Sequence, residues 1–445
     1  LGTTLALRLA EAGAQVTVLE RGPSLGGLAG TMDFGGHRVD RFYHVITPAD
    51  QRMIAMAEEL GLGEELRFKP VAAGFFADGE MHDFNGVADL LRFAPLSPVA
   101  RLRLGWFVAQ CQLRSSYQAL DRIPLEAWLR RHCGSEVVER IWKPLLASRF
   151  DGDPSGLPAT YLWARTRRMS GAREKGSGGE QMGHIIGGHQ RLIDAMAARA
   201  RELGVETRTE APVSGLTVDD EGTVTGVELG EENLEFDLTI PTLQPPALRF
   251  LLPERHQGLL APYPQRWLGV VCLILKVPRS LLPYYAVNIT ERTPVTSAVE
   301  TTQVLGTDHT DGRHLVYMPK YCAPDAPEQS EDDDSVYRRF TDYLARLSPG
   351  FRREEVVDWT VQRAKLVEPV HRLGEGHGIG IAPVWPGVDG LALASNAQIY
   401  PYLLNGDSVI GFGETVAAEV AERLQLDGEP AGKSARKGLA GALSH

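Results

Sequence analysis

The first twenty residues read as a helix, a glycine turn and a strand that ends in an acid. Alanine and leucine dominate residues 2–10, and the stretch stops at Gly13, a residue type that often follows the end of a helix. Residues 15–19 largely alternate polar with apolar side chains and include β-branched residues, which favours a strand. Glu20 follows directly. This order is that of the second half of a dinucleotide-binding βαβ unit, whose acid accepts hydrogen bonds from ribose hydroxyls. By themselves, these residues fit an ordinary helix–strand pair of an α/β protein equally well.

The spacing between Gly2 and Glu20 extends this interpretation. In the dinucleotide fingerprint the acid lies about 20 residues beyond the glycines, and here Glu20 follows Gly2 by 18 residues. If Gly2 is the third glycine of the motif, its role is to let the helix pack closely on the sheet. The chain begins at Leu1 and not at Met, so we expect the first strand and the first two glycines of the motif to precede Leu1.

A glycine-rich segment, residues 21–31 with the sequence RGPSLGGLAGT, follows the acid directly. Adjacent glycines let a backbone approach a pyrophosphate, so that amide N–H groups face its charge. The segment resembles the second fingerprint of the superfamily that contains flavin-dependent amine oxidases, protoporphyrinogen oxidases and carotenoid desaturases. This resemblance implies FAD contacts at Gly2, Glu20, Arg21, Gly26, Gly27, Leu28 and Thr31.

The same segment contains a rival pattern, because Gly22, Ser24 and Gly26 match the nucleophile elbow of the α/β hydrolases. That chemistry needs the serine on a tight turn between a strand and an immediately following helix. Residues 27–31 would begin a helix poorly. We therefore interpret Ser24 as a loop residue.

The C-terminal region resembles the part of the superfamily that closes over the flavin. Residues 390–401 read as a strand running into a loop, and a long helix follows as far as Leu424. A helix N-terminus carries about half a positive charge, which would stabilise an anionic reduced flavin. No cysteine follows Cys322, so we expect noncovalent FAD. The resemblance implies flavin contacts at Asp407, Ser408, Val409 and Ile410, and an adenine contact at Val213.

Within the superfamily, the chain is most similar to the bacterial protoporphyrinogen-oxidase-like proteins. Four segments carry this similarity: residues 41–44 (RFYH), 142–146 (WKPLL), 300–302 (ETT) and 397–401 (AQIYP). The subgroup usually has an acidic-Arg-Gly segment after the last of these. Here residues 402–406 read YLLNG instead, and this departure leaves the substrate open.

The length of 445 residues favours two domains, and 43% hydrophobic with 23% charged residues is ordinary for a globular protein. We predict an α/β fold, α+β overall, in which a Rossmann-like FAD-binding domain carries an inserted substrate domain of mixed sheet plus helices. The FAD-binding domain is discontinuous and comprises residues 1–85, 181–243 and 372–426. A helical insertion, 86–180, and a sheet, 244–371, form the substrate domain. Residues 427–445 are expected to be a disordered tail.

The predicted function is a noncovalent-FAD oxidoreductase that takes a hydride from a small organic substrate, such as an amine, a CH–CH group or a porphyrinogen-like compound. O2 or a quinone would reoxidise the flavin. The sequence does not force any acid–base residue, and a lone histidine or tyrosine is more often structural. His184 and His189 lie five residues apart, off one helical face, so no metal site is predicted. The catalytic candidates are His44, Lys143, Tyr317 and Tyr400.

Two other functions stay open: a flavin-dependent isomerase similar to UDP-galactopyranose mutase, and a truncated, noncatalytic flavin-fold protein. The formal charge of −11 argues against a nucleic-acid partner. The longest apolar run, Leu268–Leu275, is too short to span a membrane. Residues 96–113 resemble a membrane-surface helix, although we favour a buried helix there. Four scattered cysteines indicate a reducing, cytoplasmic compartment, and the oligomeric state stays undetermined.

Overall fold

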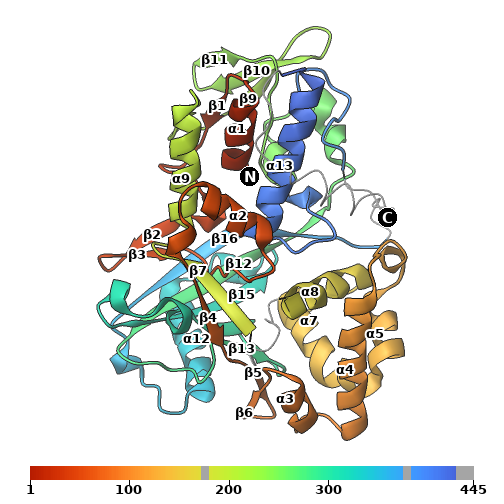
Figure 1. The fold of residues 1–445 in the computed structure, drawn as a ribbon, viewed down its shortest axis with the longest axis vertical. Helices are drawn as coiled ribbons and strands as arrows, with labels where there is room; N and C mark the ends of the chain where they lie inside the picture. The colour runs from red at the N-terminus through yellow and green to blue at the C-terminus, as the bar shows by residue number, and fades with distance from the viewer. Residues whose placement is uncertain (172–179, 374–381, 427–445) are drawn as a thin grey trace.

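The computed structural model describes residues 1–171, 180–373 and 382–426, and the predicted tail, 427–445, lies outside them. Figure 1 shows two parts stacked along the long axis of the molecule. The upper part holds the two ends of the described chain, and the lower part holds a large sheet with a separate group of helices beside it.

The upper part contains the predicted nucleotide-binding elements. β1 pairs in parallel with β8, and a separate parallel bridge joins Thr239 to Leu391. α1 packs against both α9 and α13 (Figure 1). A three-stranded sheet, β11-β10-β9, and the β2–β3 hairpin complete this part. Its elements are α1 (Gly2–Glu11), β1 (Thr17–Leu19), β2 (Thr31–Phe34), β3 (His37–Asp40), α2 (Gln51–Glu59), α9 (His189–Glu202), β8 (Glu206–Arg208), β9 (Gly215–Val218), β10 (Val224–Leu229), β11 (Glu232–Glu235) and α13 (Gly406–Arg423).

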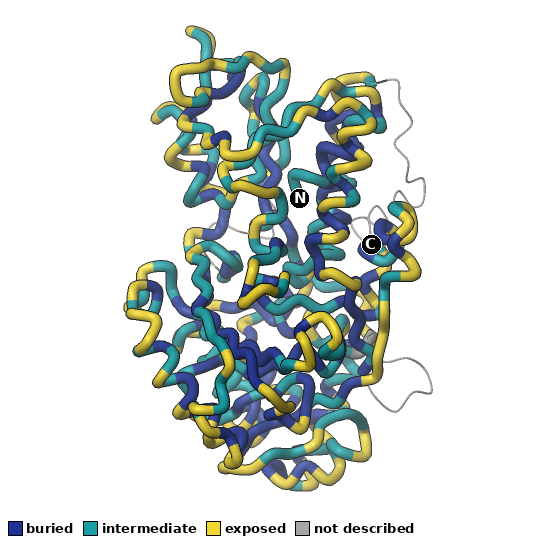
Figure 2. The backbone as a smooth tube through the Cα atoms, turned by 90° about the vertical axis from the view of Figure 1, so that its left-hand side faces the viewer, coloured by how far each residue is buried: buried dark blue, intermediate teal, exposed yellow. Residues whose placement is uncertain are grey.

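The lower part is built on a seven-stranded sheet in the order β16-β12-β15-β14-β13-β5-β6. All residues of β12 except Arg266 are buried, because α12 and the rest of the sheet pack around this strand. Figure 2 shows buried backbone gathered in the interior of the lower part. β5 and β6 lie within residues 1–85, yet they extend this sheet, since β5 pairs in parallel with β13. The strands are β5 (Ala73–Ala77), β6 (Glu80–Asp83), β12 (Arg266–Val277), β13 (Ala286–Ile289), β14 (Ser297–Glu300), β15 (His314–Cys322) and β16 (Asp358–Val370), and the helices of this part include α11 (Thr302–Leu305) and α12 (Asp333–Leu347). α10 (Pro245–Leu248) belongs to the upper part, where Leu248 packs with Leu216 of β9 and Val227 of β10.

A two-stranded antiparallel sheet of β4 and β7 stands where the two parts meet, since β4 leads into β5 of the large sheet and β7 leads into α9. β4 spans Leu66–Val71 and β7 spans Glu180–Ile185. The pairing brings together residues more than 110 positions apart, such as Leu66 and Ile185.

The helical insertion packs beside the sheet. In α4, Leu104 and Phe107 are buried, whereas Leu102 and Trp106 on the other face are 64% and 61% exposed. The prediction that residues 96–113 form a buried helix is therefore correct for one face of α4 only. Among the described helices, none combines the length and the apolar composition that a bilayer crossing requires. The insertion comprises α3 (Val87–Arg92), α4 (Pro98–Leu113), α5 (Leu125–Cys133), α6 (Ser135–Val137), a π-helical turn (Val138–Trp142), α7 (Lys143–Arg149) and α8 (Ala159–Gly171).

Candidate functional site

A cavity of about 2820 Å³ runs between the two parts of the molecule. At one end it is lined by α1 and β1, and at the other by residues of β12, β15 and β16. Pockets for small molecules usually measure about 300–1,000 Å³. This cavity therefore has room for a dinucleotide and a second small molecule together.

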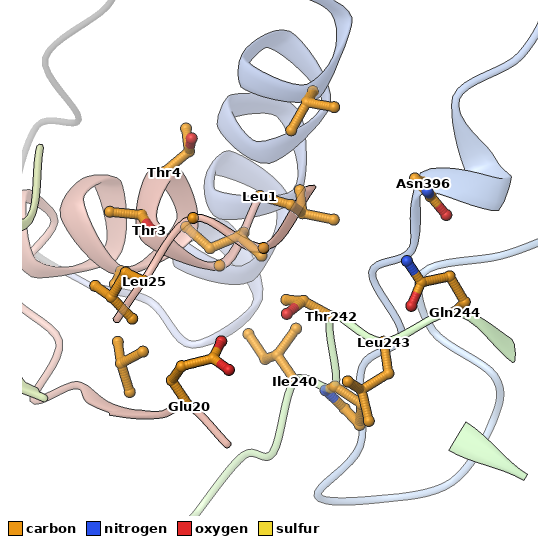
Figure 3. Close-up of a pocket in the computed structure, with 18 of the residues that line it drawn as sticks. Leu1, Thr3, Thr4, Glu20, Leu25, Ile240, Thr242, Leu243, Gln244 and Asn396 are labelled. Carbon is orange, nitrogen blue, oxygen red and sulfur yellow. The ribbon is translucent and has the colours of Figure 1, made fainter. Parts of the chain in front are cut away.

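The end of β1 forms the upper wall of the cavity. Glu20 lies there close to Ile240 and Thr242, and Leu1, directly before α1, lies between this wall and α13 (Figure 3). One carboxylate oxygen of Glu20, Oε1, accepts a hydrogen bond of 2.6 Å from the backbone N–H of Gly22. A Cβ on Gly2 would lie 3.3 Å from Oγ1 of Thr242, so the start of α1 approaches this wall closely.

The glycine-rich segment forms a backbone cradle beside β1. Gly26 has φ 126°, and a Cβ there would lie 3.0 Å from Oε1 of Gln190 and 3.1 Å from Ile193. Gly27 has φ 55° and faces open space within the cavity wall. Gln190, which our sequence reasoning missed, holds the segment by donating to the backbone oxygen of Leu25 at 3.1 Å. Arg21, Leu28 and Val213 also line the cavity, whereas Thr31 does not.

The first turn of α13 brings only some of its predicted contacts to the cavity. Val409 and Ile410 line it, together with Asn405 and Gly406. The Asp407 carboxylate instead accepts backbone N–H bonds from Arg52 and Met53, at 2.7 and 3.1 Å, and so holds the start of α2. Burial raises the pKa of Asp407.

Ser408 is also turned toward its own loop. Its hydroxyl donates to the backbone oxygen of Leu403 at 2.7 Å, and its backbone N–H donates to the Asn405 side chain at 2.9 Å. Asp407 and Ser408 thus fix the helix start and its loop, while the backbone around Gly406 faces the cavity.

Histidines form one wall in the middle of the cavity. His44 and His189 both line it, and their ring centroids are 5.0 Å apart. Burial lowers the pKa of His44 to about 4, and His189 nearby lowers it further. Tyr317 is buried behind this wall, where its hydroxyl donates to the backbone oxygen of Asp40 at 2.8 Å.

The lower end of the cavity is lined by Arg149 and Tyr321, which the sequence did not single out. The Arg149 guanidinium lies 3.4 Å from the centroid of the Tyr321 ring and pairs with Glu368. These residues come from α7, β15 and β16, so no local motif could have joined them. Arg165 also lines the cavity, and within the described residues it forms no ion pair with a carboxylate.

Besides Tyr317, two more catalytic candidates do not line this cavity. Lys143 has a side chain that is 61% exposed and pairs with Glu139 one helical turn earlier, at 3.1 Å. Tyr400 lines a separate, smaller pocket and donates its hydroxyl to Asp121. Burial raises the pKa of Tyr400. Of the four predicted candidates, the structure therefore brings only His44 to the cavity surface.

The sequence matches the family described as flavin containing amine oxidoreductase over residues 2–420. It is 25% identical over 295 residues to a provisionally named zeta-carotene desaturase of Synechococcus elongatus, and the match spans 57% of this chain and 58% of that relative. The fold resembles that of a provisionally named protoporphyrinogen oxidase from Exiguobacterium sp. 255-15, with a TM-score of 0.70, 20% identity, and 95% and 97% of the two chains covered.

A structure of reduced UDP-galactopyranose mutase is also similar, with a TM-score of 0.72, 13% identity, and 100% and 97% of the two chains covered. At such low identity, these two likenesses concern the fold, and they confirm the predicted α/β architecture over nearly the whole chain. The family match, by contrast, rests on the sequence itself and covers nearly all of the described residues. The chain belongs to the flavin-containing amine oxidoreductase family.

Proposed function

We propose that this chain binds FAD noncovalently and oxidises a small organic substrate by hydride transfer, with O2 or a quinone as the electron acceptor. The main support for this proposal is that one continuous cavity joins the backbone cradle at Gly26 and Gly27 to the wall that contains His44 and to the lower end, where Arg149 lies. A cofactor held at the cradle would thus share one enclosed space with a substrate at the lower end. Three substrate classes remain as alternatives: an amine, a compound oxidised at a CH–CH bond, or a porphyrinogen-like molecule.

The residues at the upper end fit a dinucleotide. Any side chain at Gly26 would collide with Gln190 and Ile193, so the bare backbone there permits close approach by a phosphate. Glu20 uses only Oε1 for Gly22, which leaves Oε2 to accept a hydrogen bond from a ribose hydroxyl. The first turn of α13 directs its partial positive charge to the cavity at Gly406. When bound, FAD would supply a two-electron acceptor at this place.

The lower residues would bind and orient the substrate. Because its pKa is lowered, His44 is neutral at neutral pH and offers a ring nitrogen that can accept a hydrogen bond from a substrate N–H or O–H. Tyr43 and Tyr321 provide aromatic faces beside the Arg149 guanidinium. The buried strands β12 and β15 form the floor of this end and restrict its contact with water.

The cysteines support noncovalent attachment. All four are buried, and Cys272 is the one that lines the cavity in the part of the chain that the structure describes. Burial raises the pKa of the Cys272 thiol, so little of the nucleophilic thiolate forms at neutral pH.

The deciding experiment is gel filtration of the purified chain after incubation with FAD, followed by the visible absorption spectrum. We expect a flavin spectrum that co-elutes with the protein and a flavin that acid precipitation releases into the supernatant. Flavin that stays with the acid pellet would contradict noncovalent attachment. A protein fraction without flavin, at FAD concentrations well above micromolar, would overturn the proposal. Screening amines and porphyrinogen-like compounds for flavin bleaching under anaerobic conditions then identifies the substrate class.

A second candidate is a flavin-dependent isomerase that acts on a nucleotide sugar. The observation in its favour is Arg165, a cavity-lining cation without a carboxylate partner among the described residues, which could bind a diphosphate. Turnover of a nucleotide sugar only after reduction with dithionite, with no net consumption of oxidant, would favour this candidate over the oxidoreductase.

A further inference from the structure

We propose that Asp40, His184 and His189 form a binding site for a divalent transition-metal ion such as Zn²⁺, set into the wall of the cavity. The potential ligand atoms of these three side chains all lie within 4.8 Å of one another. His189 also lines the cavity, whereas Asp40 and His184 lie behind it. The site is therefore in the wall and does not occupy the space of the proposed flavin.

Three separate elements bring the side chains together. Asp40 ends β3, His184 lies in β7, and His189 begins α9. Between the two histidines the chain turns through Gly187 and Gly188, both with positive φ. The sequence argument against a metal site assumed one helical face, but the two histidines belong to a strand and to the following helix, so that spacing rule does not apply.

The carboxylate approaches the turn closely. A Cβ at Gly188 would lie 2.9 Å from Oδ1 of Asp40, so a glycine is required for Asp40 to reach this position. On the other side, the Tyr317 hydroxyl fixes the backbone oxygen of Asp40. Asp40 is thus held with its carboxylate directed at the histidines.

Two buried polar atoms of the cluster lack a hydrogen-bond partner within the described residues. Asp40, His184 and His189 are 8%, 9% and 5% exposed, yet Oδ1 of Asp40 and Nδ1 of His189 form no hydrogen bond. Oδ2 of Asp40 and Nδ1 of His189 are 3.8 Å apart, which is within ion-pair distance but too long for a hydrogen bond. A buried polar atom without a hydrogen-bond partner destabilises the folded state. Coordination to one ion would satisfy both groups.

The donor set selects the class of metal. Two imidazoles and one carboxylate suit Zn²⁺, Fe²⁺ or Co²⁺, whereas Mg²⁺ and Ca²⁺ prefer oxygen ligands alone. Tetrahedral ligands at about 2.0–2.1 Å from Zn²⁺ stand about 3.4 Å apart. The observed spread of up to 4.8 Å means that the side chains would draw together by side-chain rotation on binding. Three protein ligands leave one coordination position open.

The test measures metal binding by the whole chain. The purified protein is first treated with EDTA to remove bound metal and is then dialysed to remove the EDTA. Zn²⁺ is titrated by calorimetry, and Co²⁺ by its visible d–d absorption, both before and after incubation with FAD. We expect one ion per chain at micromolar affinity or better. Because neither readout depends on flavin, failure of the FAD proposal and failure of the metal proposal are distinguishable.

Variants assign the ligands. Asp40→Asn and His184→Gln should each weaken Zn²⁺ binding about 100-fold, while His184→Cys, which keeps a zinc ligand, should retain it. The matched control is His256→Gln, because His256 is also a buried histidine (8% exposed) with an unpartnered Nδ1, but lies elsewhere in the chain. It should bind Zn²⁺ like the wild type.

Three outcomes would overturn the proposal: no stoichiometric ion on the wild-type chain, wild-type affinity in both Asp40→Asn and His184→Gln, or an anomalous diffraction peak for zinc at another place. Circular dichroism and urea unfolding check that each variant is folded. If His184→Gln does not fold, His184→Cys and the position of the diffraction peak decide the result.

Discussion

Gly27 and Gly36 share a left-handed backbone but face different surroundings. Their φ values are 55° and 80°, and a side chain at either would meet no atom within 4 Å. Asparagine tolerates this conformation, so Gly27→Asn and Gly36→Asn should both fold. Only Gly27 lines the cavity, where the added side chain would occupy the place proposed for a phosphate.

We therefore expect Gly27→Asn to lower FAD affinity about 10-fold or more, equivalent to about 1.4 kcal/mol. Gly36→Asn, on the exposed β2–β3 turn, should bind FAD like the wild type. Quenching of flavin fluorescence on titration measures both affinities. Equal affinities for the two variants would place the phosphate elsewhere.

Tyr317 and Tyr263 are both buried tyrosines that differ in one hydrogen bond. The Tyr317 hydroxyl donates to Asp40, whereas the Tyr263 hydroxyl has no partner within the described residues. Tyr317→Phe should lower the free energy of unfolding by about 1–2 kcal/mol, because a buried carbonyl loses its donor. Tyr263→Phe should be neutral or stabilising. Urea unfolding of the pair checks the difference, and an equal effect on both would contradict the assigned role of Tyr317.

Among single residues, contiguous motifs led to only part of the cavity lining. Gly26, Gly27 and Val409 line the cavity, because a loop or a helix start places its neighbours together, whereas Thr31, Asp407 and Ser408 of the same motifs do not line it. Their roles as FAD contacts stay predictions. Lys143 lies at the surface, where it pairs with Glu139, four residues earlier in the chain. The Arg149–Tyr321 contact joins distant elements, and no pattern along the chain reports it.

At the scale of elements, α1, α2 and α13 meet around one buried cation. Arg8 of α1 is 4% exposed and pairs with Glu11 at 2.9 Å, with Glu59 of α2 at 2.7 Å and with Glu414 of α13 at 3.1 Å. Removal of one partner from a buried ion pair leaves the others uncompensated, which typically costs about 3–5 kcal/mol.

Arg8→Met should accordingly lower the free energy of unfolding by about 3 kcal/mol. Arg130→Met is the control, since Arg130 also pairs with two glutamates, Glu126 and Glu139, but in an exposed place. Its cost should stay below about 1 kcal/mol. Urea unfolding at low salt compares the two, and equal costs would mean that burial does not strengthen the Arg8 contacts.

The elements themselves were partly predictable. From the sequence, residues 49–62 and 189–203 each read as a helix, and the apolar run at 268–277 reads as a strand; these ranges contain α2, α9 and most of β12. In each case the apolar pattern is strong and local. The partner of a strand is not local: β5 and β6 join the seven-stranded sheet through β13, more than 200 residues later. Residues 236–241 read as a short strand in the sequence, but in the described structure they form only the isolated bridge at Thr239.

For the whole molecule, the cavity couples cofactor binding to stability. Segments from the beginning, middle and end of the chain line it, so a ligand bound there contacts all of them. A ligand that binds only the folded state stabilises it by about 2.7 kcal/mol at 100 times its dissociation constant. We expect FAD to raise the thermal midpoint as its concentration rises, and Gly27→Asn to require more FAD for the same shift. A midpoint independent of FAD would contradict binding in the cavity.

The contact of α1 with α13 also has a consequence for synthesis on the ribosome. Leu5 and Leu9 of α1 pack against Val416 and Val420 of α13 in one apolar cluster. At about 5–20 residues per second, the roughly 400 residues between these helices take about 20–80 s to translate. During that interval α1 has emerged, but the face that carries Leu5 and Leu9 still lacks α13 to cover it. Chaperones that bind nascent chains therefore have a long window in which to hold α1, and the upper part can close only when translation has reached the end of α13.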